Sequence, residues 1–65
     1  MIIFADFLRS KIEDANLSQA EVARRAGMRP SQLAYILAGN GSVTITTILR
    51  LAEALEMRPR DLIPP

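Results

Sequence analysis

The first apolar residues of the chain recur at the spacing of an amphipathic helix. Positions three and four apart share one face of a helix at about 3.6 residues per turn. The apolar residues on this face are Phe4, Phe7, Leu8, Ile12 and Ala15. The pattern predicts a helix over roughly residues 3–15. Asn16 comes next, and Asn tolerates the left-handed conformation in which many helices end.

A start signal for a second helix follows directly. The Ser18 hydroxyl is placed to accept a hydrogen bond from the Glu21 amide, and the Glu21 carboxylate is placed to reach back to the Ser18 amide. This reciprocal arrangement is a capping box. We expect the second helix to cover residues 19–26 and to end at Gly27.

A third helix is predicted over residues 30–38, ending at Gly39. Pro30 suits its first turn, because the missing N–H would have no partner there. The turn before it is short, Gly27-Met28-Arg29. A three-residue turn containing Gly makes two helices cross steeply, as in a helix-turn-helix. The packed positions of this unit carry small or apolar residues: Val22, Ala23, Ala26, Met28, Leu33 and Ile36.

Two more helices complete the pattern. Thr44 is positioned to cap a fourth helix, whose broad apolar face is expected to be buried. That face consists of Ile45, Ile48, Leu49, Leu51, Ala52 and Leu55. Pro59 opens a last short helix that reaches Ile63, and the two prolines after it prevent continuation. We therefore expect an all-α fold of five helices in a single domain over residues 1–65.

Composition narrows the chemistry. The chain has 65 residues, no Cys and no His, so disulfides, a thiol nucleophile and the commonest zinc ligands are all missing. No metal site or cofactor is expected, and an enzyme is the weakest reading because no base is paired with a nucleophile. No apolar run reaches the ~18 residues of a membrane span. A cytoplasmic protein without a membrane partner follows as the expectation.

Charge is unevenly distributed although the net charge is +1. Residues 22–52 contain four arginines and no acidic residue. A segment without carboxylates suits a polyanionic partner such as nucleic acid.

These features together resemble the helix-turn-helix domains of the Cro and lambda-repressor family, the XRE group. The resemblance rests on Leu17-Ser18-Gln19-Ala20-Glu21-Val22-Ala23, Ala26-Gly27-Met28, Leu33-x-x-Ile36-Leu37-Ala38-Gly39 and Ile48-x-x-Leu51-Ala52-Glu53-Ala54-Leu55. It covers nearly the whole chain. It implies a compact, five-helix, lambda-repressor-like domain that binds operator DNA, usually as a dimer, with the third helix in the major groove.

The third helix has two different faces when drawn as a wheel. Leu33, Ile36 and Leu37 cluster on one side, and Ser31, Gln32 and Tyr35 cluster on the opposite side. A solvated helix face usually carries Lys and Glu, and this one carries neither. Gln pairs with adenine and Ser with several base edges, while Tyr donates to phosphate or packs on a thymine methyl. We therefore expect these three polar residues to contact DNA.

Further candidate contacts flank this helix. Arg29 directly precedes it, where the helix dipole disfavours a cation, which suggests guanine or phosphate contact. Pro30 offers van der Waals contact. Ser18 and Gln19 begin the second helix, whose N-terminal amides are suited to phosphate, and the resemblance places a backbone contact at Gln19. Asn40 matches a family position that often faces phosphate. Arg24 and Arg25 are explained by the dipole at a helix C-terminus instead.

The sequence departs from the family at four positions. Many relatives carry a buried Arg–Glu pair where this chain has Ile12 and Leu37, and we expect these two aliphatic residues to touch. The glycine that usually ends the fourth helix is Glu56 here, so a tighter or strained turn is expected. Pro30 stands where relatives often place a base-reading side chain, so specificity cannot be transferred from a relative.

Three functions fit this pattern. The leading one is a small transcriptional repressor that binds a near-palindromic, operator-like site on double-stranded DNA as a homodimer. Its dimer interface is expected to involve Met57, Leu62, Ile63 and the apolar N-terminus. The alternative is an antitoxin that represses its own promoter and binds a toxin protein, because the polar segment 40–47 resembles that branch. A module that binds proteins but not DNA is the third.

Overall fold

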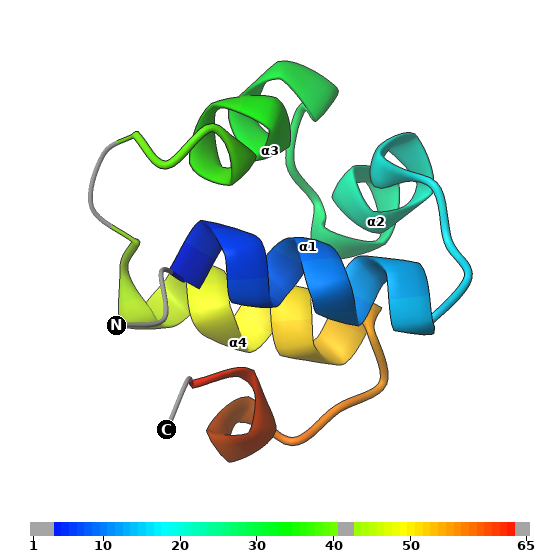
Figure 1. Cartoon of the computed structure of the whole chain (residues 1–65), viewed down its shortest axis with the longest axis vertical. Helices are drawn as coiled ribbons and strands as arrows, with labels where there is room; N and C mark the ends of the chain where they lie inside the picture. Colours follow the sequence, from blue (N-terminus) through cyan, green and yellow to red (C-terminus); the bar gives the residue numbers. More distant parts are fainter. Residues whose placement is uncertain (1–3, 41–42, 64–65) are drawn as a thin grey trace.

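The computed structural model describes residues 4–40 and 43–63, and these residues form four α-helices and one turn of 3-10 helix (Figure 1). The elements, in chain order, are α1 (Phe4–Asp14), α2 (Gln19–Ala26), α3 (Pro30–Leu37), α4 (Ile45–Ala54) and η1 (Pro59–Leu62). The predicted order of five helices is confirmed, with ends that differ by one residue. The last element is tighter than expected, because Pro59 removes a backbone donor and the segment is too short for an α-helical ladder.

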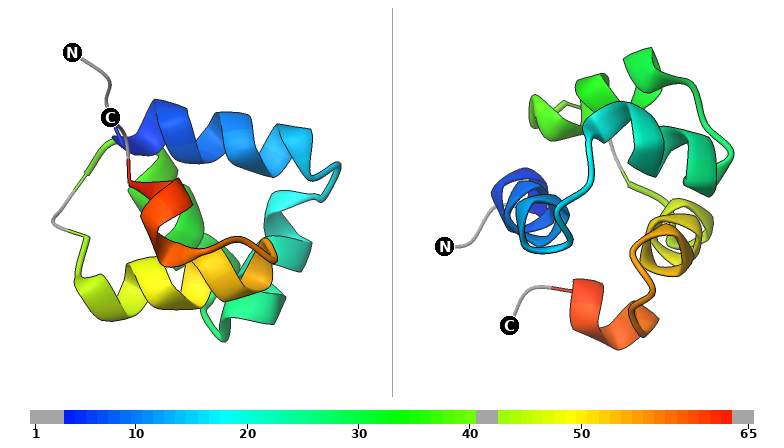
Figure 2. Two further views of the ribbon diagram at one scale, coloured as in Figure 1. Left: turned by 90° about the horizontal axis from the view of Figure 1, so that it is seen from below. Right: turned by 90° about the vertical axis from the view of Figure 1, so that its right-hand side faces the viewer.

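The helices surround one core. α1 and α4 run in the same direction and are both seen end-on in the right view of Figure 2, with α2 and α3 above them and η1 below. α2 packs against α3 and α4, while η1 packs against α4 and α1. α3 also packs against α1. The helix-turn-helix pair therefore forms one side of the molecule, and the side formed by η1 lies opposite it.

Two helices begin at the predicted hydroxyl caps. Ser18 and Thr44 are both in extended conformation, and their hydroxyls accept hydrogen bonds from the amides of Glu21 and Thr47 at 3.1 and 3.2 Å. The second half of the predicted capping box is wrong. The Glu21 carboxylate binds Arg24 and Arg25 instead of the Ser18 amide.

Each of the four α-helices ends at a residue with left-handed backbone, and the two amides after the last turn point back into the helix. The four left-handed residues are Asn16, Gly27, Gly39 and Glu56. The paired bonds are 2.9 and 3.4 Å long after α1 and 3.1 and 2.8 Å long after α4. This pattern is the Schellman motif, which gives partners to carbonyls that the helix leaves unpaired.

The core is aliphatic, and no polar or charged side chain is buried in the part of the chain described. Its largest fully buried side chains are Leu8, Val22, Leu33, Leu51 and Leu62. Ile12 and Leu37 are also buried members of this one cluster, and the expected contact between the two stays a prediction. None of the helices in residues 4–40 and 43–63 has the length and apolar character needed to cross a membrane.

The apolar face of α4 is narrower than its sequence indicates. Ile45 is 76% exposed and Leu49 is 47% exposed, so the expectation that both are buried is wrong. The first turn of α4 projects beyond η1 in Figure 1 and in the left view of Figure 2. Neighbouring elements therefore cover the second half of α4, where Leu51 and Ala54 are buried, and leave its beginning uncovered.

Candidate functional site

The turn between α2 and α3 fixes how the two helices cross. Gly27 has a φ of 70° and its amide bonds the Arg24 carbonyl at 3.2 Å, while the Met28 amide bonds the Ala23 carbonyl at 2.9 Å. Apart from Gly27 itself and its two chain neighbours, no residue has a heavy atom within 4 Å of the position that a Cβ on Gly27 would occupy. Glycine is therefore needed for its backbone conformation rather than for space. Ala23 is completely buried, as expected of a small residue at the crossing.

The two faces predicted for α3 are both confirmed. Leu33, Ile36 and Leu37 are buried, and Ser31, Gln32 and Tyr35 are exposed. Tyr35 is 58% exposed and is one of the large hydrophobic residues on the surface of the molecule.

The polar groups on the outer face of α3 have no hydrogen-bond partner among the residues that the structure describes. The side chains of Ser31, Gln32 and Tyr35 take part in none of the hydrogen bonds formed within residues 4–40 and 43–63. These donors and acceptors are therefore available to a ligand.

The remaining candidate residues border this face. Arg29 and Pro30 occupy the N-cap and the first turn of α3, and Arg29 makes no side-chain capping bond. Gln19 is exposed in the first turn of α2, next to Ser18, whose hydroxyl is used by the cap. Asn40 is exposed directly after α3. All eight predicted site residues thus lie exposed on or beside α2 and α3, and none lies on η1.

Comparison with known proteins identifies the fold. A family model described as helix-turn-helix matches residues 8–62. The chain belongs to this helix-turn-helix family. It is similar to the restriction-modification controller protein C.AhdI from Aeromonas hydrophila, with 32% sequence identity and a TM-score of 0.89. The match covers 95% of this chain and 94% of that chain. A search of the curated proteins found no significant match.

Family membership confirms several predictions. The domain is an all-α, lambda-repressor-like helix-turn-helix of the XRE group. Proteins of this family are DNA-binding regulators and not enzymes, so the expectation of a non-enzymatic DNA-binding protein holds.

Part of the positive charge of this helix-turn-helix is neutralised within α2. Arg24 bonds both carboxylate oxygens of Glu21, at 3.0 and 2.5 Å, and Arg25 bonds one of them at 2.8 Å. The hydrogen bonds from Arg24 and then Arg25 lower the pKa of the Glu21 carboxyl from 4.5 to about 2. The same contact raises the pKa of Arg24. Glu21, one position before the acid-free segment 22–52, therefore neutralises part of the positive charge of that segment.

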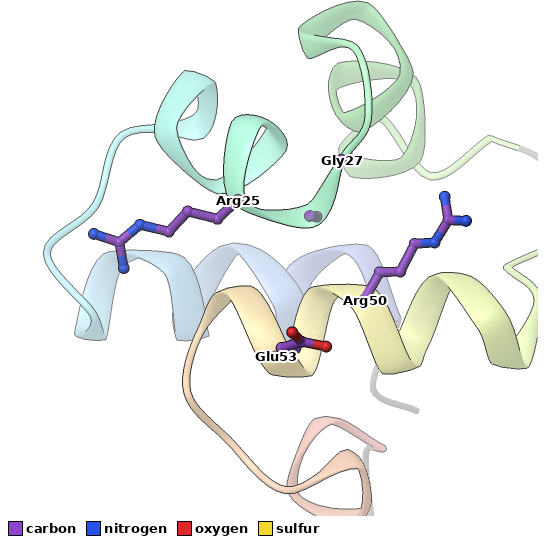
Figure 3. Close-up of a pocket in the computed structure, with 5 residues that line it drawn as sticks. Arg25, Gly27, Arg50 and Glu53 are labelled. Carbon is purple, nitrogen blue, oxygen red and sulfur yellow. The ribbon is translucent and has the colours of Figure 1, made fainter.

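A shallow depression lies between the α2–α3 turn and α4 (Figure 3). It has a volume of about 330 Å³ and is lined by Arg25, Ala26, Gly27, Arg50 and Glu53. The guanidinium groups of Arg25 and Arg50 point away from each other, and the Glu53 carboxylate lies on the α4 side between them. The two cations do not converge on one point, so the depression is not arranged to hold an anion. The described residues also contain no cluster of potential metal ligands.

One residue that the sequence pattern does not single out contacts the helix-turn-helix. Arg9 of α1 donates a hydrogen bond from Nη2 to the main-chain carbonyl of Leu37, at 2.5 Å. The two residues are 28 positions apart. Local pattern gives no signal for such a bond, because it depends on how α1 and α3 pack.

Proposed function

We propose that this helix-turn-helix domain is a small transcriptional repressor that reads a specific sequence of double-stranded DNA with α3 in the major groove. The observation that carries the proposal is the outer face of α3, which is polar, uncharged and without hydrogen-bond partners in residues 4–40 and 43–63. Free hydrogen-bonding groups on a helix supported by a rigid turn are what base reading requires. A protein with this role acts on genomic DNA, which fits the cytoplasmic location expected from the sequence.

Gln32 and Ser31 are the proposed base-reading residues. A Gln amide matches the N6 and N7 groups of adenine, and a Ser hydroxyl bonds either donors or acceptors on base edges. Tyr35 lies one turn further along α3, where its ring is suited to a thymine methyl and its hydroxyl to a phosphate. Pro30 contributes contact area at the beginning of the helix.

The residues around α3 are proposed to hold the DNA backbone. Arg29 supplies the positive charge at the entry to α3. Gln19 and Asn40 supply uncharged donors on either side, and the first amides of α2 beside Ser18 attract a phosphate through the helix dipole. Contacts of this kind set the register on the duplex but carry no sequence information.

A homodimer on a near-palindromic site is the proposed binding form. Half-sites read by paired helix-turn-helix units lie about 34 Å apart, and this domain measures 28 × 23 × 21 Å. Two copies bound one helical turn apart are therefore close enough to touch.

The proposed dimer contact uses three exposed apolar side chains, those of Ile45, Leu49 and Ile63. Ile63 is 57% exposed, and the beginning of α4 lies at the same end of the molecule as the end of η1 in Figures 1 and 2. Leu62, predicted to take part, is completely buried in the core, because η1 packs back onto α1 and α4. Met57 is half-buried against the core, and the predicted N-terminal contribution, residues 1–3, lies outside the described residues.

The regulatory role is supported by the similarity to C.AhdI, which is described as a restriction-modification controller protein. The match extends over nearly all of both chains, so the resemblance includes the surfaces outside the helix-turn-helix. We propose that this chain likewise controls transcription, with repression as the direct result of occupying a promoter.

Selection of bound DNA from a random duplex library tests the proposal. The wild type is expected to enrich a palindrome, and Gln32→Ala and Ser31→Ala are expected to lose or alter the enriched motif. Ser10→Ala is the matched control, since Ser10 is an exposed serine on α1, and it is expected to select the wild-type motif. Failure of the wild type to enrich any motif at low salt contradicts the repressor proposal.

The uncovered beginning of α4 supports an antitoxin as the second candidate. Ile45 is exposed within the segment that resembles antitoxins of this fold, and a toxin is an alternative occupant of the same apolar surface. Co-purification of the untagged chain with a second protein encoded beside it favours this candidate. A dimer without any second protein contradicts it.

A further inference from the structure

Arg9 joins α1 to the C-terminal end of α3. Its Nη2 atom donates to the Leu37 carbonyl at 2.5 Å, and its Nη1 atom lies 3.2 Å from Oδ1 of Asp6. The ion pair with Asp6 lies within α1, three residues apart. One guanidinium group is therefore fixed at both of its terminal nitrogens, one by its own helix and one by α3.

The carbonyl that Arg9 binds is one that α3 cannot satisfy by itself. Leu37 is the last residue of α3, and the last four carbonyls of a helix have no donor within it. A cation at this end also interacts favourably with the helix dipole. α1 and α2 each carry a basic residue in their own last turn, whereas α3 carries none. Arg9 supplies from α1 the charge that α3 lacks.

α3 depends on such a contact more than a longer helix would. It has eight residues, and its packing rests on Leu33, Ile36 and Leu37 along one side. Apolar packing is non-directional, whereas a hydrogen bond from a charged donor has a preferred direction and length. The bond to Leu37 therefore fixes the end of α3 in a way that the core contacts alone do not.

We propose that Arg9 is a positioning residue that sets the orientation of α3 for reading DNA. This inference rests on the proposed function of α3. With the guanidinium in place, the C-terminal end of α3 is held to α1, and Gln32 and Tyr35 are presented at a fixed angle to the groove. Without it, the end of α3 shifts and base contacts weaken, while contacts to the backbone, which tolerate small displacements, remain.

The test compares specific with non-specific binding. Arg9→Met keeps most of the side-chain stem and removes the donor, and Lys11→Met removes one positive charge from the same helix as a matched control. Lys11 lies over the Phe7 ring, 5.2 Å from its centroid, and is not bonded to α3 in the described structure. Affinities are measured for the selected duplex and for a scrambled duplex over a range of salt concentrations.

Arg9→Met is expected to bind the selected duplex roughly tenfold more weakly, the factor that corresponds to one lost hydrogen bond, and the scrambled duplex as tightly as Lys11→Met does. An equal loss on both duplexes overturns the proposal, because partial unfolding affects all binding alike. A salt slope lower than that of Lys11→Met by about 0.9 also overturns it, since that result identifies Arg9 as a phosphate contact. Unchanged affinity for the selected duplex overturns it as well.

A second measurement does not involve DNA. Amide hydrogen exchange in the last turn of α3 is expected to rise in Arg9→Met and to stay at the wild-type level in Lys11→Met. Unchanged exchange there overturns the positioning role even if the protein reads DNA. Faster exchange in a protein that enriches no DNA motif leaves the positioning of α3 intact and contradicts the proposed function instead.

Discussion

Asn16 and Glu56 end α1 and α4 in the same left-handed conformation, with φ angles of 59° and 56°. In both turns the following amide returns to a carbonyl inside the helix, from Leu17 to Ile12 and from Met57 to Ala52. The two turns differ in the side chain that must adopt this conformation. Asn visits it readily, whereas a residue such as Glu is disfavoured by roughly 1–2 kcal/mol. The strain expected at Glu56 from the sequence is thus present in the backbone.

Replacing Glu56 is expected to stabilise the domain. Glu56→Gly removes the strain but adds chain entropy to the unfolded state, so we expect a net gain of about 1 kcal/mol in the free energy of unfolding. For a domain of this size, a gain of that order raises Tm by roughly 4–8 °C. Glu56→Ala is the control, because it removes the charge and keeps the strain. Equal stability of the Gly and Ala variants contradicts the explanation.

The Glu21 contact gives the stability a dependence on pH. Hydrogen bonds from Arg24 and Arg25 lower the pKa of Glu21 from 4.5 to about 2 in the folded protein. The contribution of this carboxylate to stability is therefore fully present above about pH 4.5 and is lost as the pH falls through 2. We expect NMR titration to place its midpoint near 2. Glu21→Gln should flatten the stability profile between these two pH values.

A control for this titration is Glu13→Gln. Glu13 is an exposed acid in α1 that no arginine contacts in the described residues. Its removal should leave the acid limb of the stability profile in place. A Glu21 midpoint near 4.5 would show that the guanidinium contacts do not persist in solution.

Arg29 and Arg58 form a matched pair of positions. Each is an N-cap followed by proline, with nearly identical backbone angles of −75°, 145° and −74°, 145°. Arg29 begins α3, whereas Arg58 begins η1 on the opposite side of the molecule. Arg29→Ala is expected to reduce the slope of log affinity against log salt by about 0.9, the value for one phosphate contact. Arg58→Ala should leave the slope unchanged, and a similar loss in both variants refutes a specific contact at Arg29.

The apolar beginning of α4 predicts how the domain self-associates. Ile45→Asp places a charge within the proposed dimer contact and is expected to weaken dimerisation more than tenfold, as measured by sedimentation equilibrium without DNA. Thr46→Asp adds the same charge one position away, on a different face of α4, and is expected to have a smaller effect. Circular dichroism checks that both variants are folded. A monomeric wild type, or a dimeric Ile45→Asp, rules out this interface.

The boundaries of the helices could be predicted because they are encoded by neighbouring residues. Ser18 and Thr44 cap the helices that follow them, and Gly27 and Gly39 provide the left-handed residues after α2 and α3. These signals act over three or four positions, so nothing distant in the chain changes their outcome. The two faces of α3 were predictable for the same reason, since helical periodicity alone separates them.

The predictions that failed all concern competition or long-range packing. The Glu21 carboxylate could bind either the Ser18 amide or the guanidinium groups of Arg24 and Arg25. It binds the two guanidinium groups, because two charged donors stabilise a carboxylate more than one amide does. Leu62 and Ile45 are both apolar, and whether each is covered depends on where η1 and α4 pack. The bond from Arg9 to α3 depends on the approach of two helices that are distant in sequence. Periodicity carries no information about such approaches.

The division of α3 into two faces separates the origin of its stability from the origin of its specificity. Leu33, Ile36 and Leu37 belong to the core, while Ser31, Gln32 and Tyr35 lie outside it. Substitutions on the outer face therefore leave the folding energy almost unchanged. In evolution, the operator specificity can therefore change through single substitutions at the exposed positions of α3 without loss of the fold. In protein engineering, a different set of base-reading residues can be introduced at the same positions.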